Sequence, residues 1–483
     1  MSLNRVMQNF EENFFLYLLI IFLFCFRFET LFMPIYWDEA IYFTPSIFKN
    51  GLLDFLPHNY NPEHYHGHPP LFQLLLLASS KLFGQNPLAA HIVSFVSLTY
   101  FIFITNKFLS RYFNKKLAIS TLIIFLTYPY VFIQSLLFVP NYLMIAFALH
   151  SFIFFLEKDY TKYAVFSVLA VLTRESALSF FLFPLIVLFF DLTKKKIKLF
   201  DLIKGITPFV TIISFLIFNK LVSQRGTFIN HPYVLSRIRR NEFEFQNIID
   251  SIYWSYKALD ESTSNSFGSL VFILILCIFY IFYKRDLKKK IHFKLSRALV
   301  LYTTATLGFL AFFLFYGDTI QRDFTYVSLV YTSLLAIPMT MVLKTEIIII
   351  IVALHSLLQI ERHFEKDITD LSYASFYQRV IIYQKIADKV NEHYSDIKWI
   401  KCTWPCLTLF EEPRYGYLDK KYFTTTFDEK AELFISSKIN APNTHKTNFN
   451  IYEVDLEYEV QDIPFSPTKF YLKKELIEKD TNE

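Results

Sequence analysis

The fold is decided by the stretch from Phe14 to Phe32, which reads FFLYLLIIFLFCFRFETLF and is soon followed by Trp37-Asp38-Glu39. A transmembrane helix needs about 20 mostly apolar residues, and this run satisfies that length. An ionised carboxylate is costly inside hydrocarbon but can be placed at the membrane surface. We therefore interpret the stretch as a membrane span that ends at an acidic pair beside a surface cavity.

The rest of the chain repeats this pattern of long apolar runs. Of its 483 residues, 53% are hydrophobic and 19% are aromatic, and the runs are apolar on all sides. This predicts an all-α polytopic membrane domain with about 11–13 transmembrane helices. The later spans are expected at 88–106, 117–137, 140–156, 160–173, 176–191, 202–222, 267–283, 298–316, 323–343 and 345–361.

Basic residues give the expected orientation. The net charge of +5 is confined to loops, so it indicates topology and not nucleic-acid binding. Basic clusters follow every second span, which places them in the cytoplasm by the positive-inside rule. The first loop, 37–68, and the long loop, 223–262, then face the outside. The basic clusters are Lys107 to Lys116, Lys158 with Lys162, Lys194 to Lys198, Lys284 to Lys294, and Lys344.

The chain changes character after residue 361. Residues 1–361 form the expected transmembrane domain, whereas 362–483 have many charges and few long apolar runs. The tail predicts a small extracytoplasmic α/β domain. Its cysteines Cys402 and Cys406 could form a disulfide there or remain reduced, and the sequence leaves both open.

Polar candidates lie at the outer ends of the spans. Asp38 and Glu39 fit a general base or a metal-binding acid, and equally the first turn of a surface helix. His66 and His68 belong to a loop that also holds His58 and His64. Such a cluster fits a metal or a phosphate, or a loop at the lipid headgroups.

Three further spans end or begin with polar residues on the same side. Arg174-Glu175 and Arg322 fit phosphate binding, and they also fit local ion pairing or snorkelling. Asn141 alone reads as a helix cap. A transporter more often has its polar groups at the membrane midplane. The grouping at the outer ends favours a lipid-linked substrate whose headgroup sits at the interface.

The order of the motifs resembles a known family. The chain shows Gly67-His68-Pro69-Pro70-Leu71, the basic turn 111–116, Val139-Pro140-Asn141, and Leu172-Thr173-Arg174-Glu175 in that order after the acidic pair. It resembles the GT-C superfamily of glycosyltransferases, in the branch of protein O-mannosyltransferases and bacterial aminoarabinose and lipopolysaccharide-core transferases. Residues 10–190 carry the likeness, and Arg322-Asp323-Phe324 extends it more weakly.

The resemblance implies a function in the bacterial inner membrane. It implies inverting transfer of a sugar from a polyprenyl-phosphate donor to a glycan, lipid or protein acceptor on the outer face. Asp38 would be the general base, and Glu39 would support it or touch the donor. His68 would contact the carrier phosphate, and Arg174 and Arg322 would stabilise the leaving group. We expect membrane lipids as further partners and no nucleic acid.

Two departures from the family pattern limit what is carried over. The family often has an acid where this chain has Asn141, so this residue can orient a group but not act as a base. Aminoarabinose transferases have a metal-binding Glu where this chain has Gly67. We expect no essential metal, although His66 and His64 with a loop residue such as His231 leave a divalent ion open. His231 could instead cover the site. The rival hypotheses are a flippase for lipid-linked sugars and a non-catalytic relative.

Overall fold

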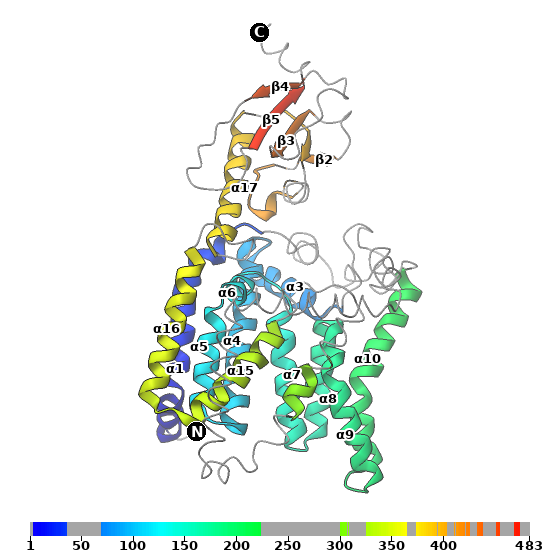
Figure 1. The fold of residues 1–483 in the computed structure, drawn as a ribbon. Coiled ribbons are helices and arrows are strands. Elements are labelled where there is room, and N and C mark those ends of the chain that lie inside the picture. The colour runs from blue at the N-terminus through cyan, green and yellow to red at the C-terminus, as the bar shows by residue number, and fades with distance from the viewer. Residues whose placement is uncertain are drawn as a thin grey trace, which may run out of the picture.

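A computed structural model shows a bundle of helices joined at one end to a region that contains a small β-sheet (Figure 1). It describes residues 3–35, 69–223, 300–306, 308, 325–364 and 373–393, and shorter stretches between 395 and 473. We call the end of the bundle that contacts the sheet region the sheet end. The helices before the first large gap are α1 (Leu3–Arg27), η1 (Glu29–Phe32), α3 (Leu71–Phe83), α4 (Pro87–Tyr112), α5 (Lys115–Thr127), α6 (Pro129–Leu136), α7 (Asn141–Leu156), α8 (Tyr160–Thr173), η5 (Glu175–Phe181), α9 (Leu182–Thr193) and α10 (Leu199–Ser223).

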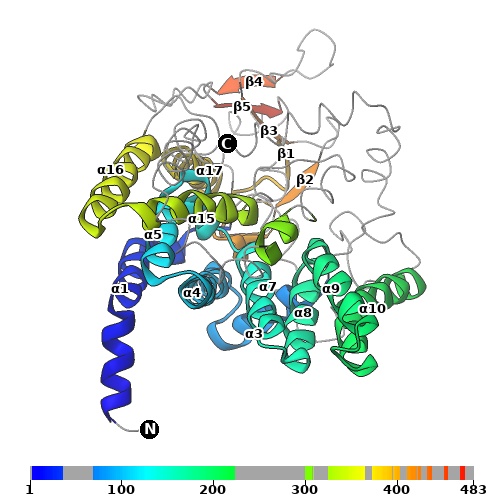
Figure 2. The ribbon, with the colours of Figure 1, turned by 60° about the horizontal axis from the view of Figure 1, so that its bottom comes forward.

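Helices α15 (Thr325–Val342) and α16 (Thr345–Phe364) also belong to the bundle, and α17 (Tyr373–His393) follows them in the tail (Figure 1). Figure 2 shows α9 and α10 on one side of α7 and α8, with α5 and α16 on the other. Helices α7 and α8, which begin at Asn141 and end just before Arg174, thus lie in the middle of the bundle (Figure 2).

Side-chain caps fix where several helices begin. The side chain of Asn86 accepts a hydrogen bond from the backbone N–H of Ala89 at 3.2 Å, and Pro87 occupies the first turn of α4. Asn114 caps α5 in the same way. At α8, the Asp159 carboxylate accepts from the backbone N–H and the ammonium of Lys162, which together lower its pKa. The sequence therefore encodes these turns locally.

Aromatic packing builds the core of the bundle. The ring of Phe101 on α4 lies 5.7 Å from that of Phe125 on α5 and 5.2 Å from that of Tyr142 on α7. The outside of the bundle is also apolar, with Phe15, Val96 and Phe190 all exposed. Apolar residues on both the inside and the outside are what a lipid environment requires. The chain is a membrane protein of mostly helical fold.

The lengths of the helices differ from the expected spans. Within the described residues, three helices are long and apolar enough to cross a membrane: Pro87–Tyr112, Glu175–Thr193 and Leu199–Phe218. The expected span 117–137 is two helices, because Pro129 lacks the N–H that would continue α5. The total of about 11–13 spans stays a prediction, because 36–68 and 224–299 lie outside the described residues.

The described part of the tail contains α17 and a five-stranded sheet of order β2-β1-β3-β5-β4. Strand β1 (Trp399–Cys402) is parallel to β2 (Phe423–Thr425) and β3 (Leu433–Ser437). Strand β5 (Thr468–Lys473) is antiparallel to β3 and to β4 (Ile451–Val454). That the tail forms a separate α/β domain stays a prediction, as do the domain limits 1–361 and 362–483. So does the pairing of Cys402, since Cys406 lies outside the described residues.

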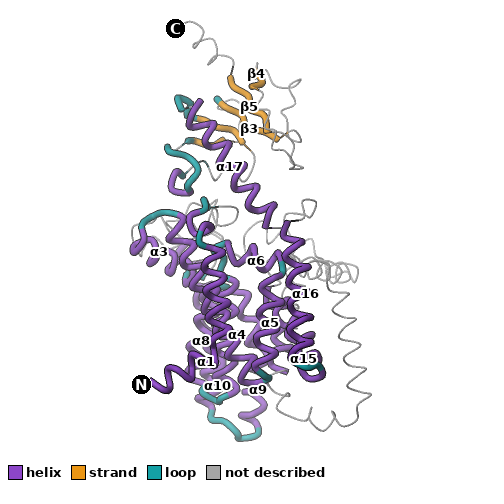
Figure 3. The backbone as a smooth tube through the Cα atoms, turned by 90° about the vertical axis from the view of Figure 1, so that its left-hand side faces the viewer, coloured by secondary structure: helices purple, strands orange, loops and turns teal. Residues whose placement is uncertain are grey.

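One hydrophobic cluster joins the bundle to the sheet region. Ile35, Phe72 and Leu136 from the bundle pack in the same cluster as Tyr415 and Tyr417 from the tail. Helix α17 contacts both α6 and α16 (Figure 3). The tail is therefore packed against the ends of the helices that carry the motifs.

Candidate active site at the sheet end of the bundle

Two residues that the sequence singled out, Asn141 and Arg174, meet directly. Arg174 lies where α8 ends, in an extended conformation (φ −158°, ψ 134°), and Asn141 is the first residue of α7. The Arg174 Nη1 donates a hydrogen bond to the Asn141 Oδ1 at 2.5 Å. Asn141 is only 2% exposed, whereas Arg174 is half-buried. The hydrogen bond therefore orients the guanidinium of a half-buried residue.

Two further residues extend this contact into a chain of hydrogen bonds. The Asn141 Nδ2 donates to the Gln134 Oε1 at 3.4 Å, and the Thr325 hydroxyl donates to the same oxygen at 2.7 Å. Gln134 lies on α6 and Thr325 begins α15. The chain Thr325–Gln134–Asn141–Arg174 thus ties together four segments at the sheet end.

The direction of these hydrogen bonds matters for the charge of the site. Because Asn141 turns its amide nitrogen to Gln134, its carbonyl oxygen faces the guanidinium. A neutral amide orients a cation without cancelling its charge. With respect to this contact, Arg174 keeps the positive charge that binding of an anion requires.

Sequence reasoning missed Gln134 and Thr325 as site residues. Gln134 is an amide within the apolar stretch 129–136, where an unpaired polar group would be costly. That signal could have marked it as part of a polar cluster. Thr325 offered none, since hydroxyls are common in apolar helices and can bond to their own backbone.

The short 3₁₀ helix η5 sets the position of Arg174 and Glu175. Helix α8 ends at Thr173, whose hydroxyl donates a hydrogen bond to the Leu169 carbonyl at 2.8 Å. The Ser176 hydroxyl of η5 contacts the Met144 sulfur of α7 at 3.5 Å. Gly308 also approaches η5, so closely that an added Cβ would lie 2.6 Å from the Ser179 carbonyl oxygen. The turn after Arg174 therefore contacts two other helical segments.

A second set of contacts fixes the segment that leads into the first outer loop. We call residues 28–35 the stem. The buried ring of His91 lies 3.1 Å from the Met33 carbonyl and 3.2 Å from the Leu136 carbonyl through its two nitrogens. The Ile35 N–H donates to the Tyr415 carbonyl at 3.0 Å. The stem is therefore held by α4 and by the tail, three residues before Asp38.

A buried cation lies beside the stem. Arg27, the last residue of α1, is 0% exposed, and its guanidinium lies over the Phe95 ring, 5.6 Å from the centroid. Such a cation–π contact stabilises a desolvated guanidinium. The sequence placed this residue inside the first span and assigned it no role.

The structure does not describe six of the predicted site residues. Asp38, Glu39, His66, His68, His231 and Arg322 lie outside the described residues. Glu175 is described as the half-buried first residue of η5. Across the described ranges, no group of three or more His, Cys, Asp or Glu residues could hold a metal. Whether the loop histidines bind one therefore stays a prediction.

Comparisons with known proteins bear on the fold. No protein-family model and no curated protein matches the chain. The crystal structure of ArnT from Cupriavidus metallidurans bound to undecaprenyl phosphate is similar over 95% of this chain and 98% of its own, with a TM-score of 0.56 and 12% identity. The apo structure of the same protein covers 94% and 97%, with a TM-score of 0.53 and 12% identity.

At this identity the likeness concerns the fold, and it extends over nearly the whole chain, not only the motif-bearing first 190 residues. The expectation from the order of the motifs is confirmed at that level: the fold of the chain is like that of ArnT.

Proposed function

We propose that the protein is a membrane glycosyltransferase that moves a sugar from a polyprenyl-phosphate donor to a lipid, glycan or protein acceptor. The observation that carries the proposal is the oriented guanidinium of Arg174 at the sheet end. The fold supports it, because one structure with this fold contains undecaprenyl phosphate. We place the sheet end on the outer face of the inner membrane, as the distribution of basic residues predicts.

Arg174 would bind the phosphate of the leaving group. As the bond between the sugar and the phosphate breaks, negative charge grows on the phosphate oxygens. A preoriented guanidinium stabilises that charge more in the transition state than in the bound donor. Asn141 holds the guanidinium in place, and in this chain it is a positioning residue that cannot take a proton.

Three predicted residues lie within three positions of described residues along the chain. Asp38 follows Ile35 by three residues, Arg322 precedes Thr325 by three, and His68 is joined to Pro69. Three residues of extended chain reach at most about 11 Å. Ile35 and Thr325 lie at the sheet end. This supports a common site in which Arg322 and His68 contact the carrier phosphate beside Arg174.

The reaction needs one base and no redox step. The Asp38 carboxylate would take the proton of an acceptor hydroxyl, with Glu39 beside it. The hydroxyl oxygen then attacks the anomeric carbon on the face opposite the phosphate. The new carbon–oxygen bond forms, the bond to the phosphate breaks, and polyprenyl phosphate leaves with both electrons. The configuration at the anomeric carbon is inverted.

The test compares membranes that contain the wild type, Asp38→Asn or Arg174→Gln, each supplied with radiolabelled polyprenyl-phosphate sugar. We expect transfer to fall about 10²–10⁴-fold without the base and about 10²–10³-fold without the guanidinium. Arg111→Gln is the matched control, because Arg111 pairs with Glu157 at the opposite end of the bundle. Equal transfer by all four proteins would refute the catalytic assignment.

A further inference from the structure

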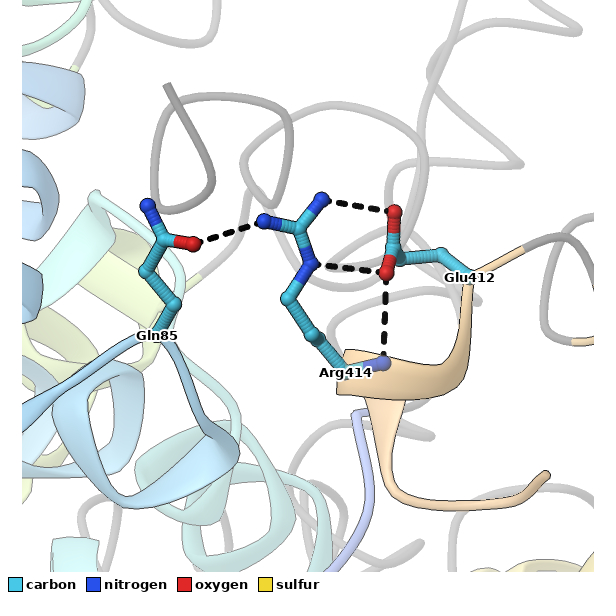
Figure 4. Close-up of polar contacts among 3 residues, drawn as sticks. All are labelled: Gln85, Glu412 and Arg414. Carbon is cyan, nitrogen blue, oxygen red and sulfur yellow. Dashed lines mark hydrogen bonds and ion pairs between the residues drawn. The ribbon is translucent and has the colours of Figure 1, made fainter. Parts of the chain in front are cut away.

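The tail contains a tight turn that contacts the bundle beside the stem. We call residues 412–418 the hook. Within the hook, Glu412 binds Arg414 through two parallel hydrogen bonds, from Nε to Oε1 at 2.7 Å and from Nη2 to Oε2 at 2.8 Å (Figure 4). The third nitrogen, Nη1, donates to the Gln85 Oε1 at 2.6 Å. Arg414 therefore links the tail to the turn between α3 and α4.

The paired carboxylate fixes the direction of that link. Glu412 raises the pKa of Arg414 further above its usual value by hydrogen bonding to it. The Glu412 Oε1 also accepts the Arg414 backbone N–H at 3.3 Å, so the carboxylate binds both ends of the residue. The guanidinium plane is thereby set before it meets Gln85.

The shape of the hook brings its backbone against the stem. Gly416 ends the turn with φ +90°, in the left-handed region that suits glycine. A Cβ there would lie 3.5 Å from the Pro34 Cα and Cβ and 3.4 Å from the Pro87 Cγ. One residue earlier, the Tyr415 carbonyl accepts the Ile35 N–H. The hook thus touches the stem and the start of α4 at the same time.

One of the two contacts lies at the start of the first outer loop, and the other lies beyond the helix that follows the loop. Ile35 is the last described residue before the loop, and α3 begins directly after Pro70 at its far end. The Tyr415 carbonyl contacts Ile35, and Arg414 reaches Gln85, which lies beyond the end of α3 away from the loop. The tail therefore contacts both the stem and the turn between α3 and α4.

The Glu412–Arg414 pair is better suited to orientation than to stability. The side chains are 39% exposed for Arg414 and 24% exposed for Glu412. Pairs that exposed contribute little to folding, because solvent screens them. Attachment of the tail is supplied instead by buried side chains such as Tyr415 and Leu418. The bidentate pair instead holds the guanidinium in one orientation, in which its third nitrogen donates to Gln85.

We propose that the hook is a positioning element of the transfer reaction, with Arg414 and Glu412 setting the distance between the tail, the stem and α3. This inference rests on the proposed function. The hook holds the stem, which ends three residues before the proposed base Asp38, and neither Arg414 nor Glu412 touches the substrate. A displacement of about 1 Å in a reacting group can cost roughly 10²-fold in rate.

The first experiment measures transfer kinetics and carrier binding for Arg414→Ala, Arg414→Lys and Glu412→Gln in the full-length protein. We expect kcat to fall about 10-fold or more for Arg414→Ala, with partial recovery in Arg414→Lys. Binding of polyprenyl phosphate and the midpoint of thermal unfolding should stay at the wild-type values. Lys420→Ala, which removes a cation that lies over the Tyr422 ring in the tail, is the control.

The second experiment locks the hook to the stem. The ideal Cβ at residue 416 lies 3.5 Å from the Pro34 Cβ, within the separation that a disulfide spans. The double variant Pro34→Cys with Gly416→Cys is assayed oxidised and reduced, so that the strain at residue 416 is the same in both states. The two single-cysteine variants control for the native cysteines. We expect the oxidised protein to be at least as active as the reduced one.

The outcomes separate this inference from the proposed function. An active wild type with wild-type kcat in both Arg414 variants would overturn the role of the hook alone. So would activity that is lost on oxidation and regained on reduction, because the hook would then have to move. A wild type that transfers no sugar would overturn the proposed function and this inference with it.

Discussion

Replacing Gly308 by alanine tests whether the position of η5 controls the site. The Cβ of alanine would lie 2.6 Å from the Ser179 carbonyl oxygen, whereas ordinary van der Waals contact begins at 3.4 Å. The obstacle is backbone, so it cannot rotate away as a side-chain tip can. The two segments must therefore separate by about 0.8 Å, and η5 begins at the residue after Arg174.

Two opposing terms set the effect on stability. Forcing a methyl group into a filled space costs about 1–3 kcal/mol. Alanine in a helix is favoured over glycine by about 1 kcal/mol. The net loss of unfolding free energy is therefore about 0–2 kcal/mol. The effect on transfer should be larger, because a shift of about 1 Å in Arg174 can cost roughly 10²-fold in rate.

Gly205→Ala is the matched control for this substitution. A Cβ at residue 205 on α10 would meet the Leu188 Cδ1, which is the end of a flexible side chain. Leucine can change rotamer to make room, and the helix gains the same preference for alanine. We expect stability within about 1 kcal/mol of the wild type and unchanged transfer.

The assay is transfer of labelled sugar in membranes, with the midpoint of thermal unfolding measured in detergent. The reasoning is confirmed if Gly308→Ala loses transfer while remaining folded and Gly205→Ala retains it. It is refuted if Gly308→Ala transfers sugar at the wild-type rate with a lowered midpoint. That result would show that η5 can move without displacing Arg174.

Three further predictions use the same measurements. Gln134→Leu removes the acceptor of two buried hydrogen bonds and should cost about 1–3 kcal/mol for each stranded donor, with transfer reduced; an unchanged unfolding midpoint would contradict this. His91→Phe removes the ring between two backbone carbonyls, so we expect faster proteolysis within residues 28–68 than in the wild type, and equal cleavage would argue against it. Asn114→Ala removes the cap of α5 and should cost about 1 kcal/mol while leaving transfer intact, because Asn114 lies at the end of the bundle away from the sheet; a loss of transfer would count against that separation.

Local signals in the sequence account for much of the fold. Long apolar runs require a membrane, and Asn and Asp before helical stretches mark where helices begin. The break at Pro129 was not predicted from the sequence. Proline is a local signal, but the apolar run continues through it. Asn141 and Arg174 were found from motif order, and the structure brings them into contact.

The sequence by itself predicted a membrane protein, its fold, and Asn141 and Arg174 as candidate site residues. Apolar runs, helix caps and the order of motifs can all be read along the chain without knowing which segments pack together. Only the tertiary structure joined Gln134 to Thr325, 191 residues apart, and Gln85 to Arg414, 329 residues apart. It also revealed why residue 308 is glycine. Such contacts depend on how the helices and the tail pack, and nothing in the local pattern around either partner specifies the other.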